Sequence, residues 1–157
     1  MNIKFDEHEL AELQVIQSRY PKKESAIMPV LWFAQKKFGW ISNEVIKYIA
    51  QLLEVSPSKV EGVVTFYTMF FKKPVGKYHI QVCTNVSCML REGEKIFRYI
   101  SEKLNISNME VTPDGKFSLE EVECMGACGG APMIAINEDY YENISFEKLD
   151  ELLATLS

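Results

Sequence analysis

Hydrophobic side chains recur at three- and four-residue intervals through roughly the first 70 residues, which is the spacing of amphipathic helices. Capping signals divide this region into segments. Asp6 and Glu9 form a capping-box pattern, Ser42 is a candidate N-cap, and Gly39 is a stop signal. The pattern predicts helices at residues 6–20, 25–38, 42–53 and 56–67.

The spacing changes after a short linker at residues 72–76. Hydrophobic and polar positions then alternate as far as Cys83, which predicts a strand, and a Pro-Asp-Gly turn precedes a second strand that leads toward Cys124. Helical spacing returns between these strands and again after Ser145, a candidate N-cap. The expected order is a strand at 78–83, a helix at 91–104, a strand at 117–122, an apolar run at 133–136, a turn region at 137–143 and a helix at 145–153.

This change of pattern predicts two domains, residues 1–73 and 74–157, in a chain of the α+β class. The first domain is expected to be a helical bundle and the second an α/β domain. Residues 63–71 carry no charge, and a helix that is apolar on all sides must be buried. We expect most of this run to be core, with a docking face for a partner as the alternative. Trp32 and Trp40 are expected to be packing residues.

Composition and charge exclude several classes of protein. Of 157 residues, 47% are hydrophobic and 25% charged, which is typical of a globular chain, and the net charge of −5 repels nucleic acid and anionic membrane surfaces. The longest nearly uncharged stretch, residues 62–71, is about half the length of a bilayer span, and no apolar signal segment opens the chain. We expect a cytoplasmic protein of bacterial type that does not bind nucleic acid and does not insert into the membrane.

The four cysteines form two closely spaced pairs, Cys83 with Cys88 and Cys124 with Cys128, each at the point where a predicted strand ends. Neighbouring strand ends in one sheet would bring the pairs together although 35 residues separate them. Spacing alone leaves four interpretations: an iron-sulfur cluster, a structural zinc site, a redox dithiol and inert buried thiols. The dithiol interpretation is weakened because neither pair has the two-residue spacing of such sites, and zinc sites usually stabilise domains with little core.

Glycines and histidines refine these alternatives. Gly126, Gly129 and Gly130 allow backbone N–H groups to approach sulfur closely, although glycines also form ordinary tight turns. The chain has two histidines, and a site with two histidine ligands would need both His8 and His79. We expect His79 to be a partly exposed strand residue and the site to contain cysteine alone.

Four sequence stretches resemble one known family. They are DGKFSLEEVECMGACGGAPM at residues 114–133, GWIS at 39–42, VTFYTMF at 64–70 and YHIQVCTN at 78–85. Together they resemble the small 2Fe-2S subunit of the flavoprotein module of respiratory complex I, the NADH:quinone oxidoreductase. The similarity runs from about residue 25 to residue 136, so it is more than a short motif.

The resemblance implies that Cys83, Cys88, Cys124 and Cys128 bind one 2Fe-2S cluster on a thioredoxin-like domain, with the N-terminal helices as the family's extension. It also implies a larger partner subunit that binds FMN, NADH and a 4Fe-4S cluster, within the peripheral arm of the complex on the cytoplasmic face of the membrane. This chain lacks the GxGxxG dinucleotide spacing. The resemblance further implies that this chain exchanges single electrons with the flavin of that partner. The chain would be a subunit of a translocase, would hold no catalytic residues itself and would not be active alone.

Two departures and three alternatives accompany this interpretation. Met125 stands where the family more often has leucine or alanine, and Gly93 lies one position after the place where a glycine is expected. Both affect packing near the cysteines and neither replaces a cysteine. The resemblance also fits the equivalent subunit of an NAD-reducing hydrogenase or an NAD-dependent formate dehydrogenase. A zinc-stabilised interaction module is the alternative from a different class.

Overall fold

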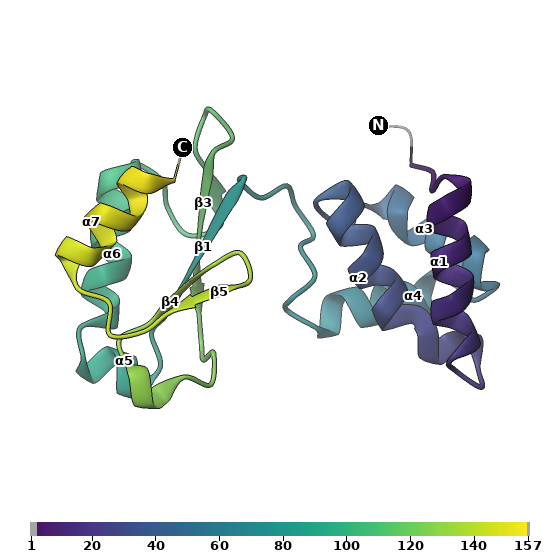
Figure 1. Ribbon diagram of the computed structural model, residues 1–157, viewed down its shortest axis with the longest axis horizontal. Coiled ribbons are helices and arrows are strands. Elements are labelled where there is room, and N and C mark those ends of the chain that lie inside the picture. Colours follow the sequence, from purple (N-terminus) through teal and green to yellow (C-terminus); the bar gives the residue numbers. More distant parts are fainter. Residues whose placement is uncertain (1–2, 157) are drawn as a thin grey trace. The chain divides into compact units, whose positions relative to one another are not determined.

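The computed structural model of the protein describes residues 3–156 and divides into two compact units, Met1–Pro74 and Val75–Ser157 (Figure 1). From residue 3 to residue 74, helices are the only regular elements, and the second unit contains a five-stranded sheet with helices. Among residues 3–156, no helix combines the length and the hydrophobicity that crossing a membrane requires.

The first unit is built from four α-helices and one short 3-10 helix. Local capping groups set the ends of these helices. The Asp6 carboxylate accepts a hydrogen bond from the Glu9 backbone N–H at 2.9 Å, and the Glu9 side chain accepts one from the Asp6 N–H at 2.7 Å, which confirms the expected capping box. The elements are α1 (Glu7–Ser18), the 3-10 helix η1 (Lys23–Ala26), α2 (Ile27–Phe38), α3 (Asn43–Leu53) and α4 (Pro57–Phe66).

The core of the first unit draws on every α-helix in it. Its fully buried side chains include Leu13, Leu31, Ile49 and Leu53. Removing such side chains from water is the main force that holds these four short helices together. Each fully buried side chain stabilises the fold by about 1.5 to 3 kcal/mol. The bundle is therefore stabilised by packing rather than by helix propensity, because isolated helices of 10 to 12 residues are marginal in water.

A buried glutamine holds the segment that follows α4. The Gln35 side chain donates to the Met69 carbonyl at 2.8 Å and accepts from the Phe71 N–H at 2.7 Å. Phe70 is consequently buried at 2% exposure, whereas Phe66 is 77% exposed and Met69 also faces solvent. The expectation that most of the apolar run at 63–71 is core is thus met only in part, because α4 ends at Phe66 and the chain leaves the helical geometry there.

The second unit contains a mixed sheet in the order β2-β3-β1-β4-β5. β1 and β3 are parallel neighbours, and the other adjacent strands pair antiparallel. Helices α6 and α7 lie on one face of this sheet (Figure 1). The elements are β1 (Tyr78–Cys83), α5 (Val86–Leu90), α6 (Gly93–Leu104), β2 (Glu110–Val111), β3 (Phe117–Val122), the 3-10 helix η2 (Cys128–Gly130), β4 (Ile134–Ile136), β5 (Asp139–Tyr141) and α7 (Phe146–Thr155).

The two faces of the sheet differ in character. Ile80 and Leu119 belong to a hydrophobic core that also contains Ile100 of α6 and Leu149 of α7. Because strand residues alternate between faces, the register places His79 beside Ser118 and Gln81 beside Glu120 on the opposite face. One face of β1 and β3 therefore contributes to the apolar core and the other carries a row of polar side chains.

Short elements account for the differences from the predicted order. The region at 137–143, expected to be a turn, contains β5, and the helix expected from residue 91 begins at Gly93 after the separate helix α5. β2 has two residues, β5 three and α5 five. Elements of this length complete no more than one or two periods of hydrophobic alternation, so the sequence pattern contains no clear signal for them.

Candidate metal centre

The carboxyl ends of the two parallel strands β1 and β3 position one cysteine of each pair, Cys83 and Cys124. Cys83 is the last residue of β1 and lies opposite Val122, the last residue of β3. The next residue of the chain, Thr84, donates its backbone N–H to the Val122 carbonyl at 3.1 Å, which extends the pairing beyond the strands. Cys124 follows Val122 by two positions, and the Cys83 thiol lies 3.8 Å from the Glu123 carbonyl. The predicted juxtaposition of strand ends is confirmed.

Helix α5 returns the chain to Cys83. Asn85 caps this helix, and Cys88, within it, is 2% exposed. The next helix begins at Gly93, where an added Cβ would lie 2.7 Å from the Cys83 carbonyl oxygen and 2.9 Å from the Cys88 carbonyl oxygen. A side chain at residue 93 would therefore collide with the backbone of both cysteines. Glycine at this position is what allows α6 to pack directly behind the first cysteine pair.

The second pair lies in the loop between β3 and β4. Cys124 and Cys128 are both exposed, unlike the first pair. The Gly126 backbone N–H points at the Cys124 sulfur, with a nitrogen-to-sulfur distance of 3.4 Å, and Gly126 has a φ of 76°. Since this φ lies in the left-handed region, glycine is favoured there. The loop thus presents a backbone donor to one sulfur, as the glycine pattern predicted.

Apolar side chains surround the buried pair. Cys83 and Cys88 form a small hydrophobic cluster with Ala131 and Met133. Three partly buried side chains pack against this cluster, and two of them belong to the loop that carries the second pair: Val122, Met125 and Ala127. Met125, at which the chain departs from the family pattern, is therefore a packing residue beside the thiols. A flexible thioether is well suited to such an irregular space.

The electrostatics of the site disfavour the thiolate form of Cys88. The pKa of the Cys88 thiol is raised to about 11, first by burial, then by the hydrogen bond to the Cys83 thiol and by the negative charge of Cys83 and Cys128, against a lowering by the Met133 backbone. The effects of Cys83 and Cys128 show that the two pairs influence one another. A cationic centre would reverse this preference, because a thiol that coordinates a metal loses its proton.

The donor set fits an iron-sulfur cluster. A 2Fe-2S cluster has two irons, each of which takes two protein thiolates, and the chain provides its thiols as two pairs. Cys83, Cys88, Cys124 and Cys128 would hold such a group.

His79 differs from its expected environment. It is 4% exposed rather than partly exposed, and both ring nitrogens have partners in β3, Ser118 Oγ at 2.7 Å and Glu120 Oε2 at 2.9 Å. It lies four residues before Cys83 and is not part of the thiol site. The sequence pattern missed this cluster because the partners lie some 40 residues away. The alternation in β3, which places Ser118 and Glu120 on one face, was the available signal.

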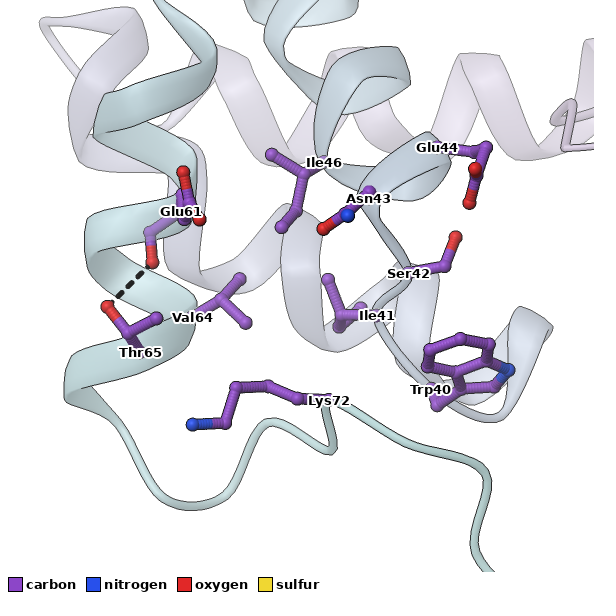
Figure 2. Close-up of a pocket in the computed structure, with 10 residues that line it drawn as sticks. All are labelled: Trp40, Ile41, Ser42, Asn43, Glu44, Ile46, Glu61, Val64, Thr65 and Lys72. Atoms are coloured by element: carbon purple, nitrogen blue, oxygen red, sulfur yellow. Dashed lines mark hydrogen bonds between the residues drawn. The ribbon is translucent and has the colours of Figure 1, made fainter.

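A second concave feature is a cavity of about 230 Å³ in the first unit (Figure 2). Trp40 and the start of α3 form one side of it, and Glu61 and Thr65 of α4 form another. The Thr65 hydroxyl donates to the Glu61 carbonyl at 2.9 Å, so it is already engaged within its helix. The lining includes charged side chains of both signs but no cysteine or histidine, so it offers no redox or soft-metal chemistry.

A thioredoxin-like sheet with four cysteines at its strand ends and in the adjoining helix and loop defines the class of thioredoxin-like ferredoxins. Comparison with known families agrees with this class, since residues 13–157 match the thioredoxin-like 2Fe-2S ferredoxin family. The chain belongs to this family.

Relatives of similar length match nearly the whole chain. The E subunit of the NADH-quinone oxidoreductase of Rickettsia bellii is 46% identical over 158 residues, covering 99% of this chain and 95% of the relative. The protein of the same name from Rickettsia prowazekii is 44% identical, covering 95% and 86%. An E subunit of the NADH-quinone oxidoreductase of Rhizobium meliloti is 43% identical, covering 90% and 84%.

A solved structure supports the fold independently. The NAD+-reducing NiFe-hydrogenase in its H2-reduced state matches with a TM-score of 0.73 at 17% sequence identity. The match covers 83% of this chain and 22% of the hydrogenase chain. At this identity the likeness concerns the fold alone.

Proposed function

We propose that the protein is the small electron-transfer subunit of an NADH:quinone oxidoreductase and that Cys83, Cys88, Cys124 and Cys128 bind one 2Fe-2S cluster in its second unit. The observation that carries this proposal is the parallel pairing of β1 and β3, whose adjacent ends bear Cys83 and lead into Cys124. Relatives that match nearly the whole chain at 43 to 46% identity carry the name of such a subunit. When bound, the cluster accepts and releases one electron.

The chain's own residues define an inner and an outer side of this site. Cys83 and Cys88 form the inner side, within the apolar cluster, and Cys124 and Cys128 form the outer side, which faces solvent. Electron transfer to a partner is expected on the outer side, where a partner can approach. The Gly126 N–H donated to Cys124 favours the reduced state, because a hydrogen bond to sulfur offsets the added negative charge.

The function requires a partner that binds the nucleotide. This chain has no GxGxxG motif to bind NADH, and we propose that it is not active alone. We propose that its partner is a larger subunit that binds FMN and NADH and carries a 4Fe-4S cluster. In this proposal the chain is a non-catalytic subunit of the peripheral arm, on the cytoplasmic side of a bacterial membrane.

Anaerobic purification of the full chain tests the cluster directly. Iron, sulfide and zinc analysis should give two irons and two sulfides per chain, with an EPR signal that appears only after reduction by dithionite. Cys124→Ser should lose most of this signal, and Met125→Leu, an adjacent control outside the thiol set, should retain it. A colourless chain with stoichiometric zinc, made in cells competent for cluster assembly, would refute the proposal.

Co-purification tests the assembly. An affinity tag on the full chain should recover a flavin-containing NADH-oxidising subunit together with the quinone-reducing complex. Recovery of hydrogenase or formate dehydrogenase subunits in their place would assign the chain to one of those assemblies instead.

A further inference from the structure

A chain of polar side chains crosses the sheet face on which Cys83 lies. His79 is at its centre: its Nδ1 lies 2.7 Å from Ser118 Oγ and its Nε2 lies 2.9 Å from Glu120 Oε2. The Gln81 side chain donates to the same Glu120 oxygen at 2.9 Å, and Ser118 Oγ accepts from the Gly76 N–H at 2.9 Å. The His79 side chain is 5% exposed and that of Glu120 is 16% exposed. Both ring nitrogens are thus engaged away from bulk water.

The hydrogen bonds determine where the ring carries its protons. An ionised carboxylate can only accept, so Nε2 of His79 must donate to Glu120. Glu120 remains ionised near neutral pH: burial raises its pKa, but the hydrogen bonds from His79 and Gln81 and the charge of His79 outweigh burial and leave the pKa lowered. The proton on Nε2 is therefore fixed, and Nδ1 is the nitrogen whose protonation can change.

Ser118 can accommodate either state of Nδ1. Its oxygen accepts one hydrogen bond from Gly76, which leaves one lone pair and the hydroxyl proton available. When the ring is neutral, the hydroxyl donates to Nδ1, and when the ring is protonated, Nδ1–H donates to the remaining lone pair. Rotation of one hydroxyl is sufficient to satisfy both protonation states, so the site can gain and lose a proton without unfolding.

The network is linked to the thiol site through the strands. His79, Gln81 and Cys83 are alternate residues of β1 and therefore lie on the same face of the strand. At about 3.3 Å per residue, His79 lies about 13 Å along the strand from Cys83. Charges at this separation interact appreciably where protein rather than water lies between them. Glu120, on β3, is the charged residue in contact with the ring. Other charged residues on the same or adjoining segments are Glu121 on β3, Lys77 and Lys116 just before β1 and β3, and Glu138 and Asp139 at the turn between β4 and β5.

We propose that His79 is a redox-linked proton acceptor, so that Nδ1 gains a proton when the four-cysteine site gains an electron. The inference rests on the proposed function. One electron comes from a one-electron donor, the partner's reduced flavin or dithionite in vitro, and one proton comes from water. The only bond formed is Nδ1–H. The added negative charge stabilises the imidazolium, and by linkage the protonated ring favours reduction.

The reduction potential of the full chain as a function of pH tests this inference. Across the titration of His79 the potential should fall as pH rises, by at most a tenfold change in the reduction equilibrium per pH unit, which is 59 mV for a one-electron couple. His79→Gln should abolish this slope. His8→Gln is the matched control, because the other histidine of the chain lies on the exposed helix α1, and it should keep the slope.

Two further measurements keep the test decisive. Glu120→Gln removes the carboxylate that stabilises the imidazolium, so the sloping interval should move to lower pH while the slope persists. NMR titration of the ring nitrogens should give a higher His79 pKa in the reduced chain than in the oxidised chain, and an unchanged His8. A pH-independent potential, or equal His79 pKa values in both states, would overturn the inference while leaving the cluster in place. A chain without iron would overturn the proposed function, and the inference with it.

Discussion

The contact between α6 and the first cysteine pair predicts a large effect of a single methyl group. In Gly93→Ala the new Cβ would lie 2.7 Å from the Cys83 oxygen, 2.9 Å from the Cys88 oxygen and 3.0 Å from the Cys88 carbonyl carbon. All three atoms belong to the backbone, so no side-chain rotation relieves the collision. Helix α6 would have to move away from β1 and α5, and the two inner cysteines would move with the backbone.

The magnitude follows from two opposing contributions. Overpacking of a tight site typically costs about 1 to 3 kcal/mol, and alanine gains up to about 1 kcal/mol over glycine in a helix. We expect Gly93→Ala to lower the free energy of unfolding of the second unit by about 1 to 2 kcal/mol, which is a factor of about 5 to 30 in the folded-to-unfolded ratio. Iron content should also fall, because the inner thiols no longer hold their positions.

Hydrogen exchange of the most protected amides in β1 and β3 measures this stability for the second unit alone. Gly129→Ala is the matched control, because an added Cβ there meets no atom within 4 Å, and it should change stability by no more than about 0.5 kcal/mol. Equal protection in Gly93→Ala and wild type would refute this reasoning. It would show that α6 can move away from the new methyl group without lowering the free energy of unfolding.

Three further predictions concern other sites. Glu92→Gly should raise the stability of the second unit by about 0.5 to 1 kcal/mol in hydrogen exchange, since Glu92 has a φ of 72°, and no gain would refute strain there. Gly62→Ala in α4 should raise the exchange protection of the first unit by about 1 kcal/mol, because its Cβ would meet open space; a loss would indicate an unseen contact. The lowered pKa of Glu120 contributes stability that is present above its ordinary value of 4.5 and is lost as pH falls through the lowered value, so Glu120→Gln should show a smaller loss in acid unfolding than wild type.

The helices and the two parallel strands were accessible from sequence because their signals are local. The Asp6 capping box and the stop at Gly39 act within one turn, and the alternation from Tyr78 to Cys83 is long enough to identify a strand. The strand order was not accessible, since it depends on contacts between distant segments. The exposure of Phe66 was also missed, because the Gln35 side chain holds the following segment from 34 and 36 residues away.

The candidate site was predictable in composition and only partly in geometry. Spacing identified four cysteines at strand ends, and the β1–β3 pairing confirms that two of those ends are adjacent. That all four bind one cluster stays a prediction. The division into a buried pair and an exposed pair was not foreseen. Cys88 is buried within α5, and a helix of only five residues leaves no clear pattern in the sequence. The structure shows why a glycine is expected at residue 92. The backbone there has a positive φ, which favours glycine, although this chain has Glu92 at that position.

The division between buried and exposed cysteines has a consequence for biogenesis. Cys124 and Cys128 are exposed, whereas Cys83 and Cys88 are buried in a hydrophobic cluster with Ala131 and Met133. If the four thiols bind one cluster, as proposed, a protein that delivers this cluster would reach the two exposed thiols before the two buried ones. Cluster delivery would therefore proceed from the exposed cysteine pair to the buried pair.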